Sequence, residues 1–155
     1  MTHSTETYQP PGQLEPGLDR IRAYWDGLKR GGGNIPFSDD VKVSMKASVA
    51  HNWALLEAFE NPNRFRFDLV SDAITQAYGS AVAGKFVDEI DSHQPFDELA
   101  SQCMATIKRR QPTYYRHAST NERKPGGRIE YARLILPLWG NGRVEMLIVG
   151  IEMLA

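Results

Sequence analysis

Two arginines are the residues of this chain whose type and position best suit ligand binding. Arg66 and Arg133 each lie within an apolar, strand-like stretch. Arginine is rarely buried without a partner, so each indicates either an internal ion pair or an anchor for a carboxylate or phosphate on a ligand. The favoured interpretation is an ion pair, with Asp68, Asp72 or Glu130 as the acceptor.

The cysteine and the histidines of the chain give weaker indications of a binding site than these arginines. The single cysteine, Cys103, lacks the neighbours of a flavin-adduct motif, and it falls on the apolar face of a predicted helix, where a free thiol packs as a small hydrophobe. His51, His93 and His117 stand at no metal-ligand spacing. The sequence therefore shows no haem, flavin-adduct or metal motif, and the cofactor stays unknown.

The sequence shows no recognisable set of catalytic residues. No Ser-His-Asp, Cys-His or paired-carboxylate pattern is recognisable, so the chain is predicted not to be an enzyme. The alternative is a small cone-shaped α+β enzyme, which would need His117, Asp68 and Tyr131 to face one cavity. Residues 108–128 hold seven Lys or Arg and one acidic residue, Glu122, but a solvated rim is favoured over a nucleic-acid patch.

Length and charge limit what the chain can be. Its 155 residues fit one domain, and the net charge of -1 gives no strong attraction to nucleic acid or to anionic membrane. One thiol builds no disulfide framework, and no apolar run reaches the ~20 residues that span a bilayer. A cytoplasmic protein without membrane or nucleic-acid partners is predicted. The polar residues 1–15 are expected to form a disordered tail, and the domain is expected to cover 16–155.

The first half is predicted to contain two helices and a hairpin. Apolar residues at helical spacing predict a helix over 18–28, which the glycines at 31–33 are expected to end. A short helix is expected from Ser38 or Asp39 to about residue 48. The length and apolar content of residues 51–59 suit either a strand or a helix, and a strand is favoured. Clean alternation predicts a strand at 64–70.

The second half is predicted to be helical first and extended afterwards. Ser71 can cap a short helix that Gly79 closes, and a second helical piece is expected over 84–90. Pro95 is expected to open a longer helix that ends near residue 110. Three strands follow at residues 113–120, 128–139 and 143–154. The last is apolar on both faces, which predicts a central place in the sheet.

This order of elements, with several local stretches, resembles a known family. The stretches are Trp25 to Gly32 leading to Pro36, Arg64 to Phe67, Tyr78-Gly79 followed by Gly84-Lys85, and Tyr131 to Leu138 with residues 144–150 behind it. In order and spacing they resemble PAS domains, and in particular a family of short stand-alone bacterial PAS-like proteins. The likeness spans residues 18–154.

The resemblance implies an α+β fold. Its five-stranded antiparallel sheet would have the order 2-1-5-4-3, with the N-terminal helix on one face and the short helices on the other. It also implies a sensory or interaction module in signalling, which binds a small ligand or a partner protein in trans and pairs as a homodimer. A structural adaptor with a filled core and no ligand is the alternative.

The resemblance also implies a possible pocket between the sheet and the middle helices. Its predicted lining is Trp53, Arg66, Phe67, Tyr78, Met104, Tyr115, Tyr131 and Arg133. Arg66 or Arg133 would be the polar anchor for a ligand. The same aromatic side chains could instead fill the space, and the sequence does not separate these alternatives.

Overall fold

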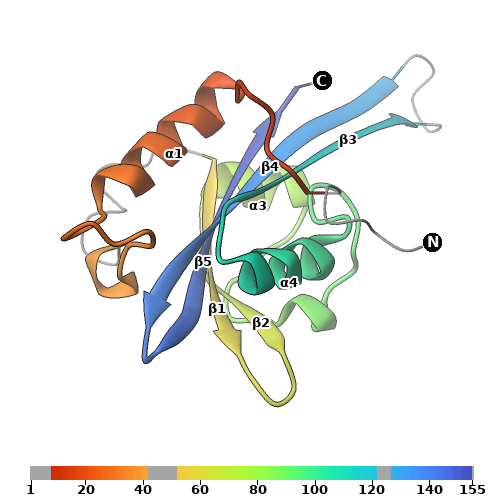
Figure 1. The fold of residues 1–155 in the computed structure, drawn as a ribbon. Helices are drawn as coiled ribbons and strands as arrows, with labels where there is room; N and C mark the ends of the chain where they lie inside the picture. Colours follow the sequence, from red (N-terminus) through yellow and green to blue (C-terminus); the bar gives the residue numbers. More distant parts are fainter. Residues whose placement is uncertain (1–7, 42–51, 122–126, 155) are drawn as a thin grey trace.

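The computed structural model describes residues 8–41, 52–121 and 127–154. Along the chain the elements are α1 (Pro16–Gly27), β1 (Trp53–Phe59), β2 (Arg64–Val70), α3 (Asp72–Tyr78), the 3-10 helix η1 (Val87–Glu89), α4 (Leu99–Arg109), β3 (Thr113–Asn121), β4 (Gly127–Gly140) and β5 (Arg143–Met153). The strands form one antiparallel sheet in the order β2-β1-β5-β4-β3 (Figure 1). The predicted fold class and strand order are confirmed.

The centre of the sheet is β5, which pairs with β1 on one side and with β4 on the other. From Val144 to Ile151 nearly every one of its residues is buried, as expected for a strand covered on both faces. The turn into β5 consists of Asn141 and Gly142, both with positive φ. Two such residues form the tight turn whose twist matches that of the flanking strands, so the register of β4 against β5 is set locally.

Helix α1 covers one face of the sheet (Figure 1). Leu18, Ile21 and Trp25 are its buried face, and the Trp25 indole donates a 2.8 Å hydrogen bond to the carbonyl of Pro137. The helix can lie this close because β5 has a glycine beneath it. A Cβ atom on Gly150 would stand 2.6 Å from Cδ1 of Ile21, so a larger residue would push α1 away.

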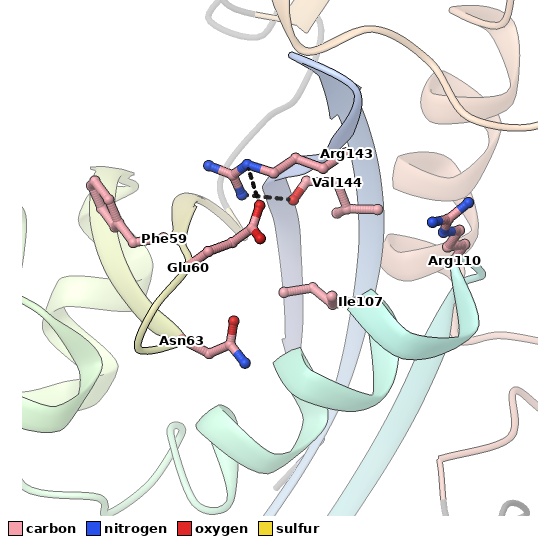
Figure 2. A pocket seen from close by; sticks show the side chains of 7 residues that line it. All are labelled: Phe59, Glu60, Asn63, Ile107, Arg110, Arg143 and Val144. Carbon is pink, nitrogen blue, oxygen red and sulfur yellow. Dashed lines mark hydrogen bonds and ion pairs between the residues drawn. The ribbon is translucent and has the colours of Figure 1, made fainter.

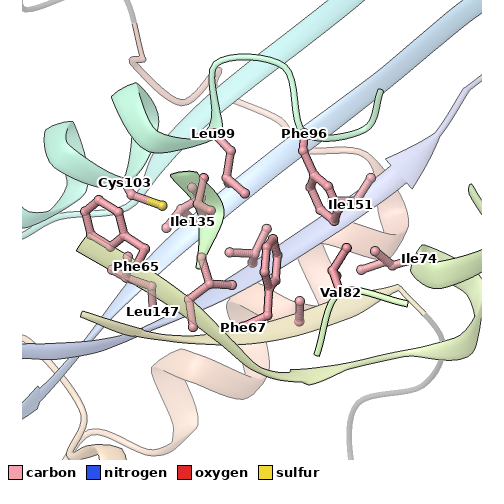
Figure 3. Packing of buried hydrophobic residues seen from close by; sticks show 14 of the residues in the cluster. Phe65, Phe67, Ile74, Val82, Phe96, Leu99, Cys103, Ile135, Leu147 and Ile151 are labelled. Carbon is pink, nitrogen blue, oxygen red and sulfur yellow. The ribbon is translucent and has the colours of Figure 1, made fainter. Parts of the chain in front are cut away.

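The other face carries α3, η1 and α4 (Figure 1). Ser71 caps α3 through a 3.3 Å bond from the Ile74 amide, and Gly79 ends that helix with φ 107°, as predicted. Between these helices and the sheet lies a dense apolar cluster (Figure 3). Its most fully buried members include Phe67, Phe96, Leu99 and Cys103.

Three predicted helix limits are wrong. The helix expected to open at Pro95 begins at Leu99, because Glu98 has a left-handed backbone (φ 54°). The piece expected over 84–90 is reduced to η1, since residues 84–85 pair with Phe67 of β2 instead. Helix α1 ends at Gly27, and the positive φ angles of Gly31 and Gly32 belong to the following loop.

Two other predictions concern segments at or beyond the limits of the described residues. A helical turn does begin at Ser38, but its continuation past Val41 lies outside the described residues, as do residues 1–7 and His51. The tail predicted to be disordered is in contact with the domain from Tyr8 onward. Tyr8 is 2% exposed, its carbonyl accepts from the Tyr114 amide, and its hydroxyl donates to Ser101 at 2.7 Å. One buried aromatic ring supplies the apolar contact that the composition of the segment does not suggest.

Candidate functional site

Six of the eight residues predicted to line a pocket share one face of the sheet. Phe67, Tyr78 and Tyr131 are buried in the cluster under α3 and α4, and Met104 and Tyr115 pack against it. Arg133 is fully buried close by. The structure therefore brings most of the predicted site together, but as packed side chains.

Arg133 makes internal hydrogen bonds from all three of its nitrogens. Nε donates to Oε1 of Gln102 at 2.7 Å, and the terminal nitrogens donate to the carbonyls of Pro95 at 2.9 Å and Asp97 at 2.7 Å. Its guanidinium carbon lies 4.7 Å from the centre of the Tyr115 ring. The predicted ion pair with Asp68, Asp72 or Glu130 is wrong for this residue. Arg133 instead fixes the turn that precedes α4.

Trp53 and Arg66 lie away from this group. Trp53 is packed with α1 on the opposite face of the sheet. Successive side chains of a strand point to opposite faces, and its neighbour Ala54 belongs to the cluster under α3 and α4. Arg66 pairs with Glu57 at 2.5 Å, directly across from it on β1, and both side chains are more than a third exposed. An ion pair was predicted for Arg66, but its partner is not among the three carboxylates named. Neither residue can join Arg133 at one ligand.

A chain of tyrosines borders Arg133. The Tyr131 hydroxyl donates to Asp97 at 2.6 Å, and the Tyr115 hydroxyl donates to Glu98 at 3.3 Å and lies 3.1 Å from Nδ1 of His117. Partial burial, with the nearby Glu98 carboxylate, raises the pKa of Tyr115 to about 12. Burial, followed by the bond to Asp97, raises the pKa of Tyr131 further. These phenols are neutral hydrogen-bond donors, so they are poorly suited to act as bases.

Because of these tyrosines, the free energy of unfolding is expected to fall at alkaline pH. The pKa of Tyr114 and of Tyr115 rises from 10.0 to about 12 on folding, so the unfolded chain loses its protons first as the pH rises. Their stabilising contribution should be complete below pH 10 and should be lost between pH 10 and about 12. Urea unfolding at a series of pH values, with tyrosinate absorbance, measures this. Tyr115→Phe should flatten the decline, and an unfolding free energy constant up to pH 12 would contradict it.

Cys103 and the histidines take structural roles in the described chain. Burial raises the pKa of the Cys103 thiol to about 12, so it is a packing residue, as predicted. His93 stacks on Tyr78 at 4.2 Å and His117 on Tyr131 at 5.3 Å. Among the described residues, no three His, Cys, Asp or Glu side chains are grouped so that they could hold a metal ion.

The arrangement required of a cone-shaped enzyme does not form. Asp68 lies on β2 and His117 on β3, which are the two opposite edges of the sheet. Tyr131 is next to His117 but is buried against Asp97. The three residues therefore face no common cavity.

One hollow lies at the end of the domain where two hairpins meet α4 (Figure 2). It encloses about 140 Å³ and is lined by Phe59, Glu60, Asn63, Ile107, Arg110, Arg143 and Val144. Two of its three charged lining residues are paired with each other, because Arg143 contacts Glu60 at 2.9 Å, and Arg143 also donates to the carbonyl of Ala58 at 3.0 Å. This leaves little in it to recognise a ligand.

A second hollow, here called the Phe37 hollow, adjoins the first through Arg110. It has a volume of about 480 Å³ and is lined by Gly33, Asn34, Ile35, Phe37, Arg109, Arg110, Gln111 and Trp139. None of the eight predicted residues lines it or the hollow of Figure 2. Its loop and its arginines were predicted to be ordinary surface. The sequence signal for the hollow is Phe37, a large apolar residue inside a loop rich in Gly, Asn and Asp.

Comparison with known proteins identifies the fold. No family model and no curated protein matches the chain. An RNA-binding light-oxygen-voltage receptor superposes with a TM-score of 0.50 and 15% identity, over 82% of this chain and 36% of the receptor chain. The PAS domain of BvgS from Bordetella pertussis (TM-score 0.45, 17% identity) is covered over 87% of its length by 76% of this chain. A sensory box sensor histidine kinase from Vibrio cholerae (0.44, 11%) is covered completely by 79% of this chain.

The type of fold follows from the sheet order and the first of these superpositions. The chain has a PAS-like fold: five antiparallel strands in the order β2-β1-β5-β4-β3, with helices on both faces. Membership of the short bacterial family stays a prediction, since no family model matches. No helix of the described chain is long and apolar enough to cross a bilayer.

Proposed function

We propose that this domain is a signalling module that acts through contacts at its surface with a partner protein. The resemblance left open a small ligand or a protein partner. The observation that favours the protein partner is the packing between the sheet and α4. There Phe67, Phe96, Leu99 and Cys103 are each at most 1% exposed, and the Phe67 and Phe96 rings lie 5.0 Å apart (Figure 3).

The buried arginine gives a second argument. A ligand carboxylate could engage Arg133 only by displacing Gln102 and two backbone carbonyls. Each displaced acceptor would then be buried without a donor, at a cost of about 1–3 kcal/mol. A small ligand at this site must therefore outweigh several lost hydrogen bonds before it gains any affinity.

Native mass spectrometry of the purified protein, with an absorption spectrum of the same sample, tests this proposal. The expected result is the mass of the chain alone, or of a pair of chains, with no absorbance beyond that of its aromatic residues. Pairing would agree with the homodimer that the resemblance implies. Additional mass that is lost on denaturation, or a visible chromophore, would contradict the proposal, because it would show an occupied interior.

A further inference from the structure

The Phe37 hollow presents apolar surface to solvent. Phe37 is 47% exposed, and among the described residues Met153 is the other large hydrophobic side chain that is exposed to this degree. Ile35 and Trp139, both partly buried, complete the apolar part of the hollow. Tryptophan and arginine together are the residue types that most often dominate the binding energy of protein interfaces.

The hollow is held in shape before any partner binds. The Trp139 amide donates to the carbonyl of Pro36 at 2.8 Å, and Phe37 forms a parallel bridge with Trp139, so the loop is attached to the end of β4. On the other side the guanidinium of Arg110 lies 5.2 Å from the centre of the Trp139 ring. A site that is already formed avoids part of the ordering cost of binding.

The charged residues that line the Phe37 hollow are all positive. Arg109 and Arg110 line it and no acidic residue does. Within the described part of the chain neither arginine forms an ion pair with a carboxylate. They stand at the C-terminal end of α4, whose dipole is equivalent to about half a negative charge, so a net positive charge remains.

The shape of the hollow selects the kind of occupant. Sites for small molecules enclose most of the ligand surface, whereas this hollow is wide open to solvent. A peptide needs only a row of contacts along one side. We infer that the Phe37 hollow binds a partner peptide that carries carboxylate side chains next to an apolar one, an inference that rests on the surface-contact role proposed above.

Nucleic acid suits the same surface less well. Binding to a phosphate backbone depends on several cations along its path. Beyond this hollow, the neighbouring cations Arg22 and Lys29 are engaged with Asp26, and Arg30 is engaged with Asp40. The apolar lining would also be left without a contact on the phosphates.

Fluorescence anisotropy with short labelled peptides tests the inference on the full chain. The probe has leucines flanked by glutamates; one comparison peptide has lysine in place of glutamate, and another has serine in place of leucine. The probe should bind saturably with a Kd below about 100 µM. Both comparison peptides should bind at least about fivefold more weakly, since loss of a central contact costs more than 1 kcal/mol.

Variants locate the binding. Arg110→Ala and Phe37→Ser should each weaken binding of the probe at least about fivefold, whereas Arg20→Ala, which removes an exposed arginine from α1, should not change it. Thermal unfolding checks that all three remain folded. Absence of saturable binding of the probe would overturn the inference. The same holds if the probe binds Phe37→Ser as tightly as the parent chain, or if single-stranded polyuridine displaces it completely.

The peptide-binding experiment and the native mass spectrometry test different statements, so one can fail without the other. If the peptides do not bind and native mass spectrometry finds the chain without a ligand, the inference fails and the surface-contact role stands. If the interior contains a ligand, the surface-contact role fails whatever the peptides do.

Discussion

Replacement of Arg133 by alanine is expected to destabilise the domain by about 3–5 kcal/mol. The change removes donors from the Pro95 and Asp97 carbonyls and from the Gln102 side chain, all around a fully buried position. Each acceptor left buried without a partner costs about 1–3 kcal/mol. Urea unfolding measures the effect, and the midpoint of thermal unfolding should fall by roughly 10 °C for a chain of this size.

Two further variants identify the cause. Arg133→Met keeps most of the volume and should still be strongly destabilised, because the three acceptors stay unpaired. Arg66→Ala is the control, since that arginine is partly exposed and paired with Glu57 on the surface, and it should cost less than about 1 kcal/mol. If Arg133→Met were as stable as the parent chain, its hydrogen bonds would not be what holds the segment before α4.

Replacement of Phe67 by alanine should cost about 3–5 kcal/mol and should open the interior. The ring is fully buried and packs 5.0 Å from that of Phe96, so its removal leaves a void where the resemblance placed a pocket. The void should bind a small apolar molecule. An increase in the unfolding temperature of the variant with benzene, absent in the parent chain, measures this.

The control for this experiment is Phe37→Ala, which removes the same ring from an exposed position. It should change the unfolding free energy by no more than about 0.5 kcal/mol and should create no benzene site. If the parent chain itself were stabilised by benzene, an open cavity would exist beside Phe67, and the filled interior would be the wrong description.

The strands were predictable because their signals are local. Alternation defines β2, Asn141-Gly142 defines the turn into β5, and the doubly apolar β5 indicates its central place. The start of α4 was not predictable in this way. Pro95 is a good first residue for a helix, but the carbonyls of residues 95 and 97 accept from Arg133, 36 or more residues along the chain. A contact over that distance leaves no local signal.

The candidate site was likewise predictable only in the features that depend on local sequence pattern. The strand residues Phe67, Tyr115 and Tyr131 lie on the sheet face under α3 and α4, where the predicted pocket required them, whereas Trp53 lies on the opposite face. Whether they line a pocket or fill it depends on volumes and rotamers in three dimensions. The Phe37 hollow joins a loop before β1, the end of α4 and the end of β4, and sequence spacing relates none of these to the others.

The central position of β5 has a consequence for the order in which the domain can form during synthesis. Within the sheet β1 and β2 make one hairpin and β3 and β4 another, and β5 is the strand that pairs with both. Until β5 has left the ribosome, each hairpin therefore has an open edge at the strand that β5 will later pair with, β1 in one hairpin and β4 in the other. Such edges bind other chains readily, so the nascent domain is most exposed to mispairing just before its last strand appears.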